Sequence, residues 1–164
     1  MILLGLDPGL RLTGWGVVRA EGNHLTHIAD GVVAVSSADD LARRLANLHS
    51  QLISLVQKFN PHEAAVEETF VNKNPKSTLK LGQARGVVMS VPALVGMPVF
   101  EYSANKVKQA LVGSGHASKE QVQAMVRTLL PGLKIEKADA ADALAVAICH
   151  AHHRQTATRI GGGR

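Results

Sequence analysis

LGLDPGLRLTGWG, residues 4–16, opens with an apolar run that ends at Asp7 and is followed by Pro8 and Gly9. Proline and glycine are typical of the end of a strand, so a strand is predicted over residues 2–7 and a second one over 13–19. An aspartate before Pro-Gly is either a turn-former or the first member of a site. The neighbours of Asp7 leave both possibilities open.

The rest of the chain predicts further strands and helices. Residues 25–35 are rich in β-formers, which indicates an antiparallel meander of three strands with 2–7 and 13–19. Leucines at three- and four-residue steps predict a helix over 37–59, capped by Ser36 or Ser37. A helix over 77–91 is expected to begin at Ser77 and to kink or end at Pro92. We also expect strands at 63–68 and 97–103 and helices at 103–112, 118–130 and 137–155.

This order of elements predicts an α/β fold with a five-stranded mixed sheet, made of a three-strand antiparallel meander plus two parallel strands and flanked by helices. The first and fourth strands are expected to be neighbours. Ligands bind beyond the carboxyl ends of parallel strands, where Asp7 and Glu67 would both lie. The 164 residues fit one domain, expected over 1–156, with a flexible tail over 157–164.

Composition narrows the class of partner. Eighteen lysines and arginines against 13 acidic residues give a net charge of +5, which favours polyanions such as nucleic acid. No apolar run is long enough to span a membrane and no leader pattern is present, so a cytoplasmic location and no membrane partner are expected. Cys149 lies in an apolar helix pattern and is expected to be a small core residue.

Four carboxylates lie in apolar surroundings, unlike an acidic surface run. Asp139 and Asp142 are three residues apart, so on a helix they share one face, and Asp7 and Glu67 end strands. Such like charges would converge only if something offset their repulsion, and a divalent cation is the simplest candidate. Oxygen ligands favour Mg²⁺ or Mn²⁺, and a pair of such ions can promote phosphodiester hydrolysis. In this scheme Asp7 bridges the metals, and Lys108 or Lys119 stabilises charge at the phosphate.

Four segments resemble the bacterial RuvC Holliday-junction resolvases: GLDPGLRLTGWGVV, AVEETFVNKNPKSTLKLGQARGV, VFEYSANKVKQALVGSGHASKEQVQ and ADAADALAVAICH. The resemblance covers nearly the whole chain. It implies a ribonuclease H-like fold and a homodimer that nicks four-way DNA junctions symmetrically in homologous recombination and repair. It also implies dependence on Mg²⁺, with two ions per subunit and Mn²⁺ able to substitute, and cooperation with the RuvA–RuvB branch-migration complex.

The resemblance also implies roles for particular residues. The metal-binding and catalytic acids fall on Asp7, Glu67, Asp139 and Asp142, and the supporting lysines on Lys108 and Lys119. Phe70 matches an aromatic residue that stacks at the junction core. Glu68 stands where relatives carry glutamine, and we treat it as a neighbour of the site.

Other polar residues are candidates for contact with DNA. Beside Phe70, an exposed ring that could stack on bases, a polar loop offers phosphate contacts, and the helix after it adds two cations. The set of predicted DNA-binding residues is Phe70, Lys73, Asn74, Lys76, Lys80, Arg85 and Arg11. Trp15 is interpreted as a packing residue, and the histidines of CHAHHR, residues 149–154, as a frayed helix end.

Two other functions compete with a nuclease. LGLDPG also resembles the first phosphate motif of actin-like ATPases and sugar kinases, but the chain lacks the second domain and the further nucleotide loops that they need. The other alternative is a DNA-binding structural module that binds junctions without cutting them.

Overall fold

A computed structural model describes residues 1–68 and 73–161 and confirms the expected five-stranded mixed sheet. The strand order is β3-β2-β1-β4-β5, in which β1 pairs antiparallel with β2 and parallel with β4. The strands are β1 (Ile2–Asp7), β2 (Leu12–Glu21), β3 (His24–Ala34), β4 (Glu63–Glu67) and β5 (Val99–Tyr102). The first and fourth strands are therefore neighbours, as predicted.

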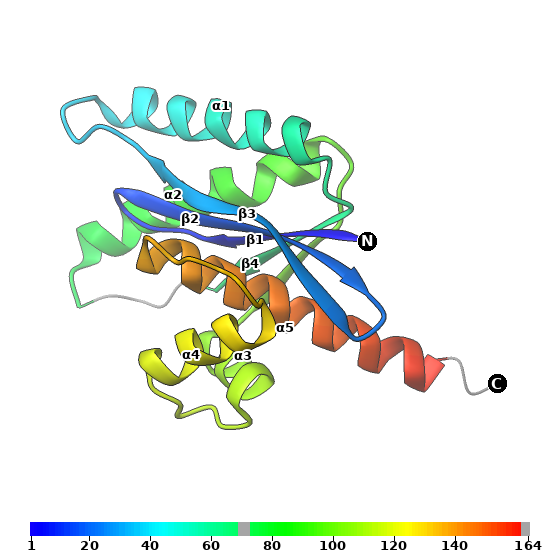
Figure 1. Ribbon diagram of the computed structural model, residues 1–164. Coiled ribbons are helices and arrows are strands. Elements are labelled where there is room, and N and C mark those ends of the chain that lie inside the picture. The colour runs from blue at the N-terminus through cyan, green and yellow to red at the C-terminus, as the bar shows by residue number, and fades with distance from the viewer. Residues whose placement is uncertain (69–72, 162–164) are drawn as a thin grey trace.

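Helices cover both faces of the sheet (Figure 1). Two of them, α1 (Leu41–Phe59) and α2 (Pro75–Leu94), pack on one face, and α5 (Ala138–Gly161) crosses the other. The two shorter helices, α3 (Ala104–Val112) and α4 (Lys119–Leu129), pack against α5 on that second side. No helix among the described residues is both long and apolar enough to cross a bilayer.

Several helix boundaries differ from the predicted ones because other side chains cap the first turns. The cap of α1 is Asp40, whose carboxylate accepts from the Arg43 N–H, and neither Ser36 nor Ser37 has this role. Asn74 caps α2, so Ser77 does not open it. Pro92 lies in the last turn of α2 and does not end it, since a missing N–H there removes only one hydrogen bond.

The C-terminal helix is also longer than predicted. Although it was expected to end at residue 155, α5 continues to Gly161, so residues 157–161 of the predicted tail are helical. His150 belongs to the core of the molecule, and the interpretation of this region as a frayed helix end was wrong. Cys149 is buried, as expected, and Trp15 packs against Phe59 with ring centroids 5.7 Å apart.

Alternation of side chains along the strands divides the core in two. Leu4, Leu6 and Val66 pack under α1 and α2. Leu3 and Ala65 face α5. Side chains an even number of residues apart in a strand point to the same face of the sheet. Asp7 is four residues from Leu3, and Glu67 is two residues from Ala65, so both carboxylates lie on the face that α5 covers.

Glycines let α5 approach this face closely. A Cβ atom at Gly5 would lie 2.0 Å from the carbonyl oxygen of Ala143, and one at Gly14 would lie 2.0 Å from that of Asp139. Both distances are far below van der Waals contact. Any side chain at these positions would push α5 away from β1 and β2.

We predict that Gly5→Ala lowers the free energy of unfolding by about 1–3 kcal/mol, since the added methyl group must displace helix backbone. Equilibrium unfolding in urea measures the change. Gly82→Ala on α2 is the matched control, because a Cβ atom there would meet nothing within 4 Å. It should stabilise the protein by about 0.5–1 kcal/mol, and an equal loss in both variants would contradict the packing argument.

Candidate active site

Two parallel strands end side by side with a carboxylate each. In the register of β1 and β4, Leu6 lies opposite Val66, so the next residues along the strands are Asp7 and Glu67. Pro8 and Gly9 follow Asp7, and β4 ends at Glu67 itself. The parallel pairing therefore brings both carboxylates to one edge of the sheet, on the face that α5 covers.

The first turns of α5 bring two further carboxylates to the same edge. The carbonyl group of Asp139 lies against Gly14, which pairs with Asp7 across β1 and β2. Asp142 follows one turn later, and both aspartate side chains are partly buried. The close approach of the helix thus sets the position of these carboxylates relative to the strand ends.

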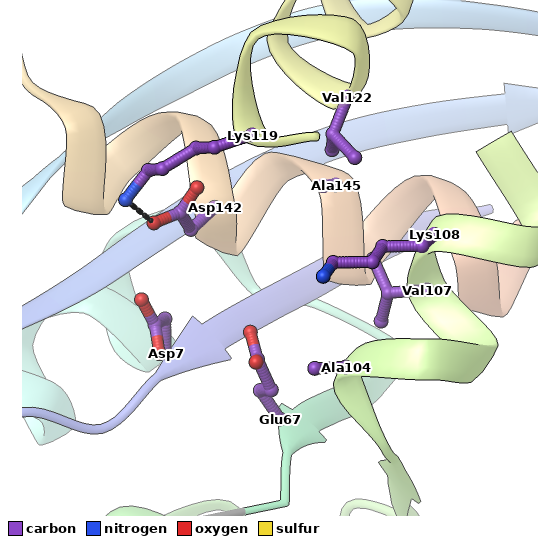
Figure 2. A pocket seen from close by; sticks show the side chains of 9 residues that line it. All are labelled: Asp7, Glu67, Ala104, Val107, Lys108, Lys119, Val122, Asp142 and Ala145. Atoms are coloured by element: carbon purple, nitrogen blue, oxygen red, sulfur yellow. Dashed lines mark ion pairs between the residues drawn. The ribbon is translucent and has the colours of Figure 1, made fainter. Parts of the chain in front are cut away.

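The carboxylates and two lysines line an open pocket of about 240 Å³. Figure 2 shows Asp7 and Glu67 projecting from the strands, Asp142 from α5, Lys108 from α3 and Lys119 from α4 into a shared space. Asp139 is not one of the lining residues, but its charge acts on both Asp7 and Lys119. Small apolar side chains complete the walls: Ala104, Val107, Val122 and Ala145.

Burial and mutual repulsion make the two strand-end carboxyls weak acids. The pKa of Asp7 is raised to about 8, first by burial and then by the charges of Glu67, Asp142 and Asp139. The pKa of Glu67 is raised to about 7 by burial and by Asp142, against the opposing effect of Lys119 and Lys108. The pocket therefore disfavours negative charge that no cation balances.

Lys119 supplies part of the balancing positive charge. Its Nζ lies 2.7 Å from Oδ2 of Asp142, and this hydrogen bond is the main cause of the raised pKa of the lysine (Figure 2). Lys108 stands on the other side of the pocket, near Glu67. Both lysine side chains can face an anion that enters the pocket.

The donor set fits a hard divalent cation. Each candidate ligand is a carboxylate, and a cation between them would remove the repulsion that raises the pKa values of Asp7 and Glu67. Within residues 1–68 and 73–161, no three carboxylate, imidazole or thiol groups already stand at the positions of metal ligands. In this arrangement the ammonium group of Lys119 is the cation beside Asp142.

The predicted DNA-binding residues that the structure describes do not line this pocket. Lys73, Lys76, Lys80 and Arg11 are exposed, and Asn74 is exposed while its side chain caps α2. Arg85 differs from them because its guanidinium group donates to the carboxylate of Glu101. Phe70 lies outside the described residues.

Sequence reasoning missed the apolar walls of the pocket. Val107 and Val122 face it, and a signal was present: Val122 follows Lys119 by one helical turn, and Val107 precedes Lys108. Both valines look like ordinary helix core residues until the packing of α3 and α4 on α5 is known. Both are apolar and nearly buried, so one side of the pocket is lined by side chains that cannot solvate a charge.

Comparison with known proteins points to one family. The model of the family described as "Crossover junction endodeoxyribonuclease RuvC" matches residues 3–150. A protein of that name from Rhodospirillum rubrum is 60% identical, with 100% of each chain covered, and one from Paramagnetospirillum magneticum is 61% identical, covering 98% of this chain and 96% of its own.

Solved structures agree with this assignment. Thermus thermophilus RuvC in complex with a Holliday junction substrate has a TM-score of 0.90 and 37% identity, with 96% of this chain and 97% of that chain covered. The yeast mitochondrial resolvase Ydc2 shares the fold alone, with a TM-score of 0.67 and 15% identity over 97% of this chain and 83% of its own. The expected ribonuclease H-like fold is thereby confirmed.

We predict that Asp7→Asn stabilises the metal-free protein. Asp7 has a pKa of about 8 in the folded state and 3.8 as a free carboxyl. Between these values the unfolded chain releases the proton and the folded protein keeps it, so the free energy of unfolding falls as the pH rises from about 4 to 8. The gain in the free energy of unfolding should be small at pH 4 and reach roughly 2–4 kcal/mol at pH 9. Urea unfolding in EDTA across this range measures it.

Glu21→Gln is the matched control, because Glu21 is an exposed carboxylate at the end of β2. It should change stability by less than about 0.5 kcal/mol at every pH. A gain from Asp7→Asn that is the same at pH 4 and pH 9 would contradict the electrostatic explanation.

Proposed function

The chain belongs to the RuvC family of crossover junction endodeoxyribonucleases, and we propose that it resolves four-way DNA junctions by a symmetric pair of nicks, in homologous recombination and repair. One observation carries the proposal: partly buried carboxylates and two lysines line one open pocket in a chain this similar to a resolvase solved with its junction. A hydrolytic site for a phosphodiester needs both kinds of group.

Asp7, Glu67, Asp139 and Asp142 are the proposed ligands of Mg²⁺, with two ions per subunit and Mn²⁺ able to substitute. When bound, the metal would lower the pKa of a water and stabilise the oxygen that leaves the phosphate. The four carboxylates would hold the cations at the strand ends, and coordination would in turn keep Asp7 and Glu67 ionised. Asp7 is the central ligand in this proposal, since three other carboxylates act on it.

Lys119 and Lys108 are proposed as catalytic cations. Lys119 neutralises Asp142 in the absence of metal, and it could turn to the scissile phosphate once a metal takes that place. Lys108 stands across the pocket and would stabilise negative charge that develops on the same phosphate (Figure 2). The apolar walls strengthen both interactions by excluding water.

The path of the DNA beyond the pocket follows the exposed cations. We propose phosphate contacts from Arg11, Lys73, Lys76 and Lys80, with Asn74 beside them and Phe70 stacking at the junction core. Arg85 would contact a phosphate only after its ion pair with Glu101 opens, so it should contribute less to DNA affinity than the exposed cations.

Symmetric cutting of two strands calls for two active sites related by a two-fold axis, so we propose a homodimer. Exposed leucines on α2 support an interface there: Leu79 is 66% exposed and Leu94 is 73% exposed. Cooperation with a RuvA–RuvB branch-migration complex and a cytoplasmic location also stay predictions.

Incubating the protein with a synthetic four-way junction tests the activity. With Mg²⁺ it should release nicked duplexes, and EDTA should prevent this. Asp7→Asn should lower the cleavage rate by at least about a thousandfold, since it removes the central ligand, while junction affinity in EDTA changes less than about twofold.

Glu21→Gln is again the control and should cut like the wild type. If the wild type binds the junction but never cuts it with Mg²⁺ or Mn²⁺, the protein is a junction-binding structural module. Equal cutting by Asp7→Asn would remove Asp7 from the site.

Sedimentation velocity at micromolar concentration should give twice the 17.4 kDa mass of one chain. Replacing Leu79 and Leu94 by lysine should shift the protein to the monomer, because buried charges oppose association. Leu41→Lys on α1, where the leucine is 38% exposed, is the matched control and should leave the dimer intact. A monomeric wild type would contradict the proposal.

A further inference from the structure

His150 is a fully buried polar side chain far along α5 from the carboxylates. It is 1% exposed and contacts residues of two paired strands, β4 and β5. Its Nε2 lies 2.7 Å from Oε2 of Glu63, at the start of β4, and its Nδ1 lies 2.8 Å from the hydroxyl of Tyr102, at the end of β5. One imidazole ring thus ties the helix to two neighbouring strands.

The three groups form a complete hydrogen-bond set. A neutral imidazole can donate from Nε2 to the Glu63 carboxylate and accept at Nδ1 from the Tyr102 hydroxyl. Burial lowers the pKa of His150 and raises that of Tyr102 to about 12, which agrees with this assignment. One turn further along α5, Nε of Arg154 lies 2.9 Å from the same oxygen of Glu63.

Helix and strand run in opposite directions between this set and the pocket. The start of β1 lies near the end of α5, where Nε of Arg154 is 3.2 Å from Sδ of Met1, and the end of β1 lies near Asp142. Since β1 and β4 are parallel, β4 is also antiparallel to α5. Figure 1 shows α5 crossing under the sheet from the end of β1 toward its start.

The spacings along the two elements match. Glu63 and Glu67 share one face of β4 and are separated by four residues, about 13 Å along a strand. His150 and Asp142 are separated by eight residues, about 12 Å along a helix. A contact between Glu63 and His150 therefore brings Asp142 level with Glu67.

We propose that the pair of Glu63 and His150, the Glu63–His150 clamp, is a positioning device that holds α5 at the one axial position in which its aspartates face Asp7 and Glu67. Both clamp residues are positioning residues, since neither lines the pocket. The expected effect of the clamp on the cleavage rate rests on the proposed nuclease function, whereas its expected effect on Mn²⁺ affinity can be measured without cleavage.

The fold has a need for such a clamp. Between the clamp and the pocket, α5 packs closely on the sheet through apolar side chains, among them Ala143 and Ala147 at Gly5 and Leu144 at Gly16, and apolar contacts of this kind are not directional. At the pocket, like charges push the first turn of α5 away from the strand ends. A slip by one residue would move Asp142 by about 1.5 Å, and misplacement by about 1 Å can cost a hundredfold in rate.

His150→Leu and Glu63→Leu test the clamp. Each should lower kcat on a saturating four-way junction by about ten- to a hundredfold, while junction affinity in EDTA changes less than about twofold. Mn²⁺ affinity, measured by calorimetry without DNA, should fall about tenfold, because the carboxylates no longer converge. The double variant should lose no more than Glu63→Leu alone, since that change already breaks both the contact with His150 and the ion pair with Arg154.

Two further variants separate positioning from stability. His150→Gln keeps an amide N–H that can donate to Glu63 and should recover most of the lost kcat and Mn²⁺ affinity. Ile148→Ala removes a fully buried apolar side chain of the same helix, so it should lower Tm at least as much as His150→Leu. Its kcat and Mn²⁺ affinity should stay within about twofold of the wild type.

The outcomes distinguish the clamp from the nuclease proposal. Wild-type Mn²⁺ affinity in His150→Leu, or an equal loss in Ile148→Ala, would overturn the clamp. Should His150→Leu fail to fold, Glu63→Gln takes its place: about a threefold loss of Mn²⁺ affinity supports the clamp, and no loss overturns it. If the wild type never cuts junctions but Mn²⁺ affinity follows the expected pattern, the nuclease proposal fails and the clamp stands.

Discussion

The close approach of α5 to β1 and β2 is the constraint on which the site depends. The helix backbone lies so near the strands at Gly5 and Gly14 that any Cβ atom would overlap a carbonyl oxygen. This contact carries the aspartates of α5 to the end of β1, where the parallel pairing of β1 with β4 has already put Asp7 beside Glu67. If side chains at these positions held α5 further from the sheet, Asp139 and Asp142 would be separated from Asp7 and Glu67.

Convergence of like charges has an energetic cost that the rest of the fold offsets. Burial and repulsion raise the pKa of Asp7 to about 8, so the metal-free pocket resists full ionisation. Lys119 compensates Asp142 directly, and His150, near the middle of α5, is hydrogen-bonded to Glu63 and Tyr102 of the sheet. The pocket thus gathers negative charge that a divalent cation would balance.

Much of this could be predicted from the sequence. The Pro8-Gly9 turn, the glycine-punctuated β-formers and the leucine periodicity of 37–59 are local signals, and each led to an element that the structure contains. Predicted boundaries were wrong where capping decided them, since Asp40 and Asn74 compete with nearby serines for the first turn. His150 could not be recognised, because its partners Glu63 and Tyr102 stand far away in the chain and give no local pattern.

The sequence by itself determined the order of strands and helices and the identity of the acidic residues, because backbone preferences and side-chain periodicity act between near neighbours. Only the tertiary structure decided which carboxylates share a pocket, that Lys119 pairs with Asp142 while Arg85 pairs with Glu101, and that a histidine near the middle of α5 is bonded to the start of β4. These contacts join residues remote in the chain, and their geometry follows from the register of the strands and the distance between helix and sheet.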